Sequence, residues 1–223
     1  MSSVLSRGIA TLAVAVAALG PLGGAGAQQP DVRIGWTAWA DAEVVSKMTY
    51  FMLGRLGLDA ELTLADVSAQ YQALANDDLD LMLMSWQPET HAQYLERYGD
   101  RLEDLGPLYE GADVGLAVPT YVDESIQTVG DLAEHAERFN GRIEGIGATA
   151  GVMRLTEEAM TTYGLEDFDL RASSGPAMAK RLGEAVAEER PIVVTGWRPG
   201  GSGGHLRQPR IRPRHGPRGL QRG

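Results

Sequence analysis

Residues 32–41 read VRIGWTAWAD, a short apolar stretch that gives way to small and acidic residues and holds two of the four tryptophans of the chain. The first half, VRIGW, predicts a β-strand, and Asp41 predicts the cap of a following helix, because its side chain accepts hydrogen bonds from free backbone N–H groups. That helix is expected to end at Gly57. Its apolar residues share one face, the pattern of a core-facing stripe: Val44, Val45, Met48, Phe51, Met52 and Leu56.

The alternation of strand and helix patterns continues along the chain and predicts an α/β fold. Further strands are expected at 60–66, 79–86, 114–119, 141–147 and 191–197, and further helices at 69–77, 88–98, 129–137, 151–164 and 174–190. These strands and helices form two consecutive strand–helix series, which join near Pro119 and Thr120. This organisation indicates two lobes, at residues 28–118 and 119–197.

The N-terminal 27 residues have the pattern of a secretory signal peptide. Arg7 precedes an apolar run over residues 9–19, and Ala25-Gly26-Ala27 forms a small-x-small cleavage signal before Gln28. The run is short for a membrane span. We therefore expect an exported, periplasmic protein. The chain has no cysteine, which excludes disulfides, thiolate metal sites and a cysteine nucleophile. It also disfavours a lipid anchor.

Charge is distributed unevenly. All 30 acidic residues but only 13 of the 20 basic ones precede Arg198, which leaves residues 1–197 with a net charge of −17. This sign argues against nucleic acid and anionic membranes as partners. Residues 198–223 instead hold seven Arg, seven Gly and four Pro with no acid. We expect this tail to be disordered or the product of a shifted reading frame. A functional basic tail that binds an acidic partner or nucleic acid is the less favoured alternative.

All four tryptophans lie at or just after the expected carboxyl ends of strands, where ligands bind in open α/β sheets. Trp36 lies inside its strand and is assigned to core packing. The other three, Trp39, Trp86 and Trp197, each lead into a polar or turn segment. Several indole faces around one cavity suit a quaternary ammonium cation, which cannot donate hydrogen bonds.

Two further features are candidates for holding the rest of such a ligand. Asp41 lies two residues after Trp39 and would favour choline over a betaine, whose carboxylate it would repel. The glycine-rich turn Gly147, Ala148, Thr149, Ala150 and Gly151 opens a helix, so its N–H groups would receive a carboxylate. The turn is equally consistent with a tight strand-to-helix connection.

Five segments resemble the substrate-binding proteins of ABC importers for glycine betaine, choline and related quaternary ammonium compounds: RIGWTAWADAEVVSKM, ANDDLDLMLMSWQPETHAQY, DLGPLYEGADVGLAVPTYV, GRIEGIGATAGVMRLTEEAMTTYGL and RPIVVTGWRP. The resemblance covers residues 31–199, and the SWQPxTH and TGWxP segments are its most specific parts. It implies a two-lobed type II periplasmic-binding-protein fold without cofactor or metal. The lobes would close over the ligand and deliver it to a permease in the inner membrane.

The resemblance also implies roles for single residues. By motif position, Trp39, Trp86 and Trp197 would enclose the trimethylammonium group, and the amides of Gly147 to Gly151 would meet a ligand carboxylate. After GWxP the family continues with His-Trp and a segment that returns to the first lobe, whereas here Gly200 begins the arginine-rich tail. The fold is therefore expected to be truncated at its C-terminus, with the first lobe incomplete.

The resulting hypothesis is a receptor for glycine betaine first and choline second, with a role in osmoprotection. A frameshifted remnant without transport function is the main alternative. A periplasmic hydrolase using His91 and nearby acids has less support, because no second catalytic constellation accompanies it. His91 with Glu89 makes a poor metal pair, so His91 is assigned to a helix surface. Tyr109 and Tyr121 remain open between a further aromatic wall and packing at the lobe junction.

Overall fold

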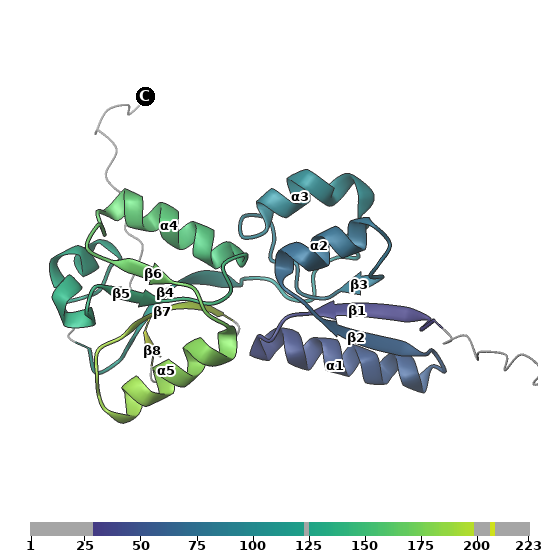
Figure 1. Cartoon of the computed structure of the whole chain (residues 1–223), viewed down its shortest axis with the longest axis horizontal. Helices are drawn as coiled ribbons and strands as arrows, with labels where there is room; N and C mark the ends of the chain where they lie inside the picture. Colours follow the sequence, from purple (N-terminus) through teal and green to yellow (C-terminus); the bar gives the residue numbers. More distant parts are fainter. Residues whose placement is uncertain (1–28, 123–124, 199–205, 208–223) are drawn as a thin grey trace, which may run out of the picture.

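A computed structural model describes residues 29–122, 125–198 and 206–207, and shows two α/β lobes side by side (Figure 1). The first lobe contains a parallel sheet of three strands in the order β2-β1-β3, and the second a five-stranded sheet in the order β6-β5-β7-β4-β8. The strands are β1 (Val32–Trp36), β2 (Ala60–Leu64), β3 (Leu81–Met82), β4 (Asp113–Pro119), β5 (Arg142–Glu144), β6 (Asp169–Arg171), β7 (Val193–Arg198) and β8 (Leu206–Arg207).

Helices cover both faces of each sheet, as the strand–helix alternation predicts (Figure 1). Helix α1 lies on one face of the first sheet and α2 and α3 on the other, and α4 and α5 lie on opposite faces of the second sheet. The helices are α1 (Ala40–Arg55), α2 (Val67–Ala75), α3 (Ala92–Tyr98), η1 (Gly99–Arg101), η2 (Gly130–Phe139), α4 (Gly151–Tyr163) and α5 (Gly175–Ala187). Among the described residues, no helix has the length and apolarity to cross a membrane.

Two hydrophobic clusters stabilise the part of the chain that the structure describes. One lies within the second lobe, where Leu132, Phe139 and Leu165 pack on the strand residues Ile143 and Val193. The other runs between the lobes, because Trp39 and Tyr71 from the first lobe share it with Ile146, Met153 and Val194 from the second. The junction is therefore a packed apolar interface.

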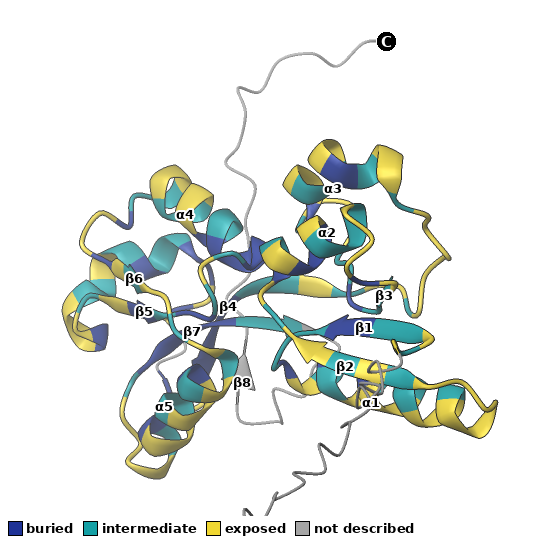
Figure 2. Cartoon of the chain, turned by 45° about the vertical axis from the view of Figure 1, so that its right-hand side comes forward, coloured by how far each residue is buried: buried dark blue, intermediate teal, exposed yellow. Residues whose placement is uncertain are grey.

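The expected apolar face of α1 is on the opposite side of the helix from the core. Val44, Met48, Phe51, Met52 and Leu56 are exposed, whereas Ala42 and Ser46 are buried (Figure 2). The periodicity identified the stripe correctly, but the sheet covers the other side of the helix. Asp41 is also not the cap, since α1 begins after Trp39 and Asp41 lies in its first turn.

The order of the predicted strands and helices is observed, but several boundaries differ. β4 pairs with β7, so the whole of β4 belongs to the second sheet, and the boundary expected at 118/119 falls within this sheet. The expected strand at 79–86 contains only two strand residues, and the helix expected from residue 88 begins at Ala92. Strand β6 was not predicted, because its three residues lack a strand pattern.

The described residues of the tail expected at 198–223 lie in strands, since Arg198 is the last residue of β7. Residues 206–207 form β8, which pairs antiparallel with Val118 and Pro119 of β4. Backbone pairing to an open sheet edge needs no particular side chain, which is why composition did not predict it. The predicted signal peptide at residues 1–27 and the rest of the tail lie outside the described residues.

Candidate functional site

Three of the four tryptophans meet between the lobes. Trp39 follows β1, and its ring centroid lies 5.9 Å from that of Trp197 in β7, with the two planes tilted by 52°. Trp86 follows β3 and lines the same cavity, together with Val114, Ile146, Ala150 and Gly151. The ends of strands from two sheets face each other here, so residues distant in sequence form one apolar wall.

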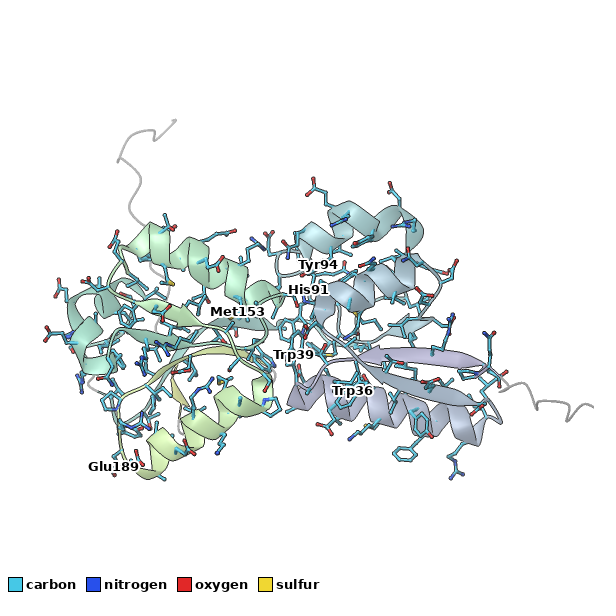
Figure 3. All side chains as sticks on the ribbon, viewed as in Figure 1. Trp36, Trp39, His91, Tyr94, Met153 and Glu189 are labelled. Atoms are coloured by element: carbon cyan, nitrogen blue, oxygen red, sulfur yellow. The ribbon has the colours of Figure 1, made fainter. Side chains whose placement is uncertain are left out.

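Trp36 lies apart from this cluster, on the side of β1 that faces α1 (Figure 3). Its ring packs beneath the Lys47 ammonium, with Nζ 5.4 Å from the ring centroid. A cation–π contact with a side chain of the same lobe is a structural interaction. This location agrees with the assignment of Trp36 to packing rather than to ligand binding.

The tryptophan cavity is small in this conformation. Its volume is about 20 Å³, and Trp39 is only 8% exposed. Such a space holds about one water molecule. A trimethylammonium group therefore requires the lobes or the rings to move apart before it enters.

Asp41 lies beside the indoles in the first turn of α1. Burial raises the pKa of this carboxyl, and the backbone N–H groups of Ala42 and Asp41, followed by the Trp197 indole and the Tyr109 hydroxyl, partly offset that effect. Within the described part of the chain, neither carboxylate oxygen has a hydrogen bond of normal geometry, and the Trp197 Nε1–H also lacks one. A buried carboxylate without a full set of partners is costly, so a cation placed next to it is stabilised.

Tyr109 is an additional aromatic residue at the site. Its ring contacts Trp86 edge-to-face, with centroids 6.1 Å apart. Burial and the negative charge of Asp41 raise the pKa of its hydroxyl to about 12. Tyr121, the other tyrosine left open by the sequence, instead donates to the carbonyls of Ala185 and Arg190. Only Tyr109 of the two is therefore a candidate wall of the cage.

His91 is fully buried and lines the tryptophan cavity, which corrects its assignment to a helix surface. The backbone N–H of Trp86 donates to His91 Nδ1 at 3.1 Å, and the Tyr71 hydroxyl lies 3.3 Å from the same nitrogen. Burial lowers the pKa of His91 to about 4, so the ring is neutral at physiological pH. Because Nδ1 accepts, the proton resides on Nε2, and no group in the described residues pairs with that atom.

The glycine-rich turn is divided between two cavities. Ala150 and Gly151 line the tryptophan cavity, whereas Gly147, Thr149 and Ala150 line a second one of about 420 Å³; Ala148 lines neither. The second cavity is the larger of the two and is also lined by Thr37, Asp66 and Ser174, and Trp39 lines both cavities. A side chain carbon added at Gly147 would lie 3.8 Å from Asp66 Oδ1. An anion at this turn would thus approach a carboxylate.

Direct contacts hold the lobes together at this edge. The Tyr94 hydroxyl donates to the Thr149 carbonyl at 2.7 Å, and Arg154 Nη2 donates to the Glu89 carbonyl at 2.8 Å. At Gly151 the approach is closer than a side chain permits, because an added Cβ would lie 1.8 Å from the Thr90 carbonyl oxygen. Glycine is therefore required here for lobe contact.

Sequence patterns alone did not identify His91 or decide the role of Tyr109. His91 follows a short turn after Trp86, and its burial depends on Tyr71 and Tyr94 packing around it. Tyr109 belongs to an irregular segment without periodicity. The motif SWQPxTH was the one signal that could have linked His91 to Trp86.

The family model described as "Substrate binding domain of ABC-type glycine betaine transport system" (OpuAC) matches residues 30–205. The chain is 31% identical, over 46% of its length and 34% of the relative, to the glycine betaine/carnitine transport binding protein GbuC of Listeria monocytogenes.

Two solved structures are similar to the chain at the level of fold and sequence. Lactococcal OpuAC, in its closed form complexed with glycine betaine, is 35% identical with a TM-score of 0.68, over 75% of this chain and 65% of that one. An ABC-transporter choline-binding protein in complex with choline is 28% identical with a TM-score of 0.69, over 75% of this chain and 60% of that one. The chain thus spans less than two thirds of the length of these relatives.

Proposed function

Because this chain belongs to the OpuAC family of substrate-binding domains, we propose that it is an exported receptor for a quaternary ammonium compound. It would act in the periplasm and deliver its ligand to the permease of an ABC importer in the inner membrane. The observation that carries the proposal is the convergence of Trp39, Trp86 and Trp197 on one cavity beside the Asp41 carboxylate.

The indoles alone do not account for useful affinity. Each cation–π contact contributes about 0.5 to 2 kcal/mol, so three contribute about 2 to 6 kcal/mol. A micromolar dissociation constant requires about 8 kcal/mol. The charge of Asp41 supplies an additional attraction in a site that largely excludes water.

The charges around the site support choline over glycine betaine. Both ligands carry the trimethylammonium group, but glycine betaine adds a carboxylate. Asp41 borders the indoles and Asp66 faces Gly147, so a ligand carboxylate would meet a like charge at either position. The N-terminus of α4 at the glycine-rich turn favours an anion. We propose that the two acidic residues outweigh this effect, which reverses the order of ligands expected from the sequence.

Ligand binding would be coupled to lobe movement. The tryptophan cavity is too small for the ligand as it stands, so the lobes would open, admit the cation and close again. Closure would restore the hydrogen bonds from Tyr94 to Thr149 and from Arg154 to Glu89. The ligand then stabilises the closed form in proportion to its preference for that form.

Titration with choline and with glycine betaine tests the proposal. Tryptophan fluorescence should change on addition of each ligand, because the responding indoles contact it, and choline should bind more tightly. Tetramethylammonium, which lacks both hydroxyl and carboxylate, reports the cage by itself. No response to any of the three ligands at millimolar concentration would refute the receptor function.

A further inference from the structure

The second cavity between the lobes has the size of a ligand site. Its volume of about 420 Å³ falls in the range of about 300 to 1,000 Å³ that is typical of small-molecule sites, whereas the tryptophan cavity measures about 20 Å³. The segment between β2 and α2 lines its first-lobe side, and the segments leading into α4 and α5 line its second-lobe side. The trimethylammonium group in the tryptophan cage leaves this space free for another part of the ligand.

The second cavity adjoins the tryptophan cavity. Trp39 from the first lobe and Ala150 from the second line both of them. Trp39 lies at the junction of the lobes (Figure 3), and a side chain carbon added at Gly175 in the wall of the second cavity would lie 3.3 Å from its Cδ1 atom. Because the two shared residues belong to opposite lobes, lobe opening widens the passage between them. A ligand held in the cage can therefore extend its other end into the second cavity.

The lining of the second cavity combines apolar side chains with one acidic group. Among the described residues that line it, Asp66 alone is charged. Asp66 occupies the N-cap position of α2, but its carboxylate makes no capping hydrogen bond. It faces Gly147 of the other lobe instead, 3.8 Å from a side chain carbon added there. The apolar part of the lining suits a methylene chain and consists of Trp39, Leu64, Ala65 and Val67.

The start of α5 also borders the second cavity but offers few donors to an anion. The Ser174 hydroxyl already accepts from the backbone N–H of Ala177 at 3.2 Å, and Pro176 has no N–H group. The Ser174 oxygen and the Asp66 carboxylate are instead acceptors, which suit a group that donates hydrogen bonds. The cavity therefore favours a positively charged end over a negatively charged one.

We propose that the second cavity is a subsite for the arm of the ligand, meaning the chain attached to the trimethylammonium nitrogen, and that it selects arms ending in an ammonium group. The proposal rests on the receptor function proposed above, and extends its ligand class from choline to longer trimethylammonium compounds with a second positive charge. The methylene groups of the arm would pack on the apolar lining, and the terminal ammonium would donate to the Asp66 carboxylate. An arm ending in a carboxylate would be repelled by Asp66.

Isothermal titration calorimetry of the full chain with two series of ligands tests the subsite. One series consists of alkyltrimethylammonium ions, and the other has arms of the same lengths with an amino group at the end. Affinity should rise about threefold for each methylene group that enters the cavity. The terminal ammonium should add about two- to fivefold over a terminal methyl group, because Asp66 is exposed and water screens its charge.

The variant Asp66→Asn identifies the group that selects the end of the arm. It should remove the advantage of the amino series, strengthen the binding of an arm that ends in a carboxylate, and leave choline affinity unchanged. Glu61→Gln is the matched control, because Glu61 is an exposed acidic residue of β2 in the same lobe and lines neither cavity. This control should alter none of these affinities.

The outcomes separate the subsite from the receptor function. Affinity that falls steadily as the arm lengthens would overturn the subsite, as would equal affinities of the two series or an advantage of the amino series that survives in Asp66→Asn. Choline and tetramethylammonium would still bind in each of these cases, so the receptor function would stand. Absence of binding by every compound, tetramethylammonium included, would overturn the receptor function and the subsite together.

Discussion

Replacing Asp41 by Asn tests whether its charge selects the ligand. The carboxylate borders the indoles and lacks hydrogen-bond partners of normal geometry in the described residues, so its charge is available to a cation. At an effective dielectric constant of about 20, a carboxylate about 5 Å from a quaternary nitrogen contributes about 3 kcal/mol. Asp41→Asn should therefore weaken choline binding roughly a hundredfold.

Glycine betaine should respond differently to the same substitution. Asn removes the attraction for the trimethylammonium group, but it also removes the repulsion of the ligand carboxylate, so the affinity should change less than about tenfold. Isothermal titration calorimetry of both ligands measures the ratio directly. Asp100→Asn, at an exposed position in η1, is the control and should change neither affinity. Equal losses for both ligands, or an unchanged choline affinity, would refute the assigned role of Asp41.

The substitution should also stabilise the protein without ligand. Burial raises the pKa of Asp41 in the folded state, so folding favours its protonated form. Protonated Asp41 therefore contributes to the free energy of unfolding at pH values below its ordinary pKa of about 4. This contribution is lost as pH rises through the raised pKa of the folded state. Asn carries no charge, so the Tm of the variant should exceed that of the parent at neutral pH. The difference should vanish as pH falls below about 4, and thermal melts across this range measure it.

Three further variants or conditions test other parts of the site. Trp197→Ala removes one cage wall and the ring contact with Trp39, and should weaken both ligands about 5- to 300-fold by calorimetry, while Trp36→Phe should leave affinity unchanged. Gly151→Ala places a carbon against the opposite lobe, so it should lower both Tm and ligand affinity. Gly54→Ala is the control, because its added carbon meets open space and should have a smaller effect. Equal effects of the two substitutions would contradict the close contact between the lobes. Burial lowers the pKa of His91 to about 4, so the titration of this side chain should not change choline affinity between pH 5 and 8. If choline affinity instead changes near pH 6.5, and this change is absent in His91→Gln, then His91 is not neutral in this range.

The sequence alone predicted those features that depend only on residues close together in the chain, such as the ends of helices. The glycine that ends α4 was predicted because a left-handed residue, here Gly164 with φ of 71°, stops a helix irrespective of the rest of the fold. The helix expected at 174–190 is observed as α5 from Gly175, and Ser174 caps it locally by accepting from the backbone N–H of Ala177 three residues later. The sequence also placed Trp39, Trp86 and Trp197 near the ends of strands. From this placement we expected their rings to meet.

Tertiary structure decided everything that depends on which distant segment covers a residue. Periodicity showed that α1 has an apolar stripe, but the side that the sheet covers is set by the β1 and β2 segments, and the stripe containing Phe51 lies outside. His91 is buried because Tyr71 and Tyr94 enclose it, and Asp41 gains its raised pKa from burial at the lobe junction. A sequence determines hydrogen bonds within a turn and the spacing of apolar residues, whereas burial and electrostatics arise from long-range packing.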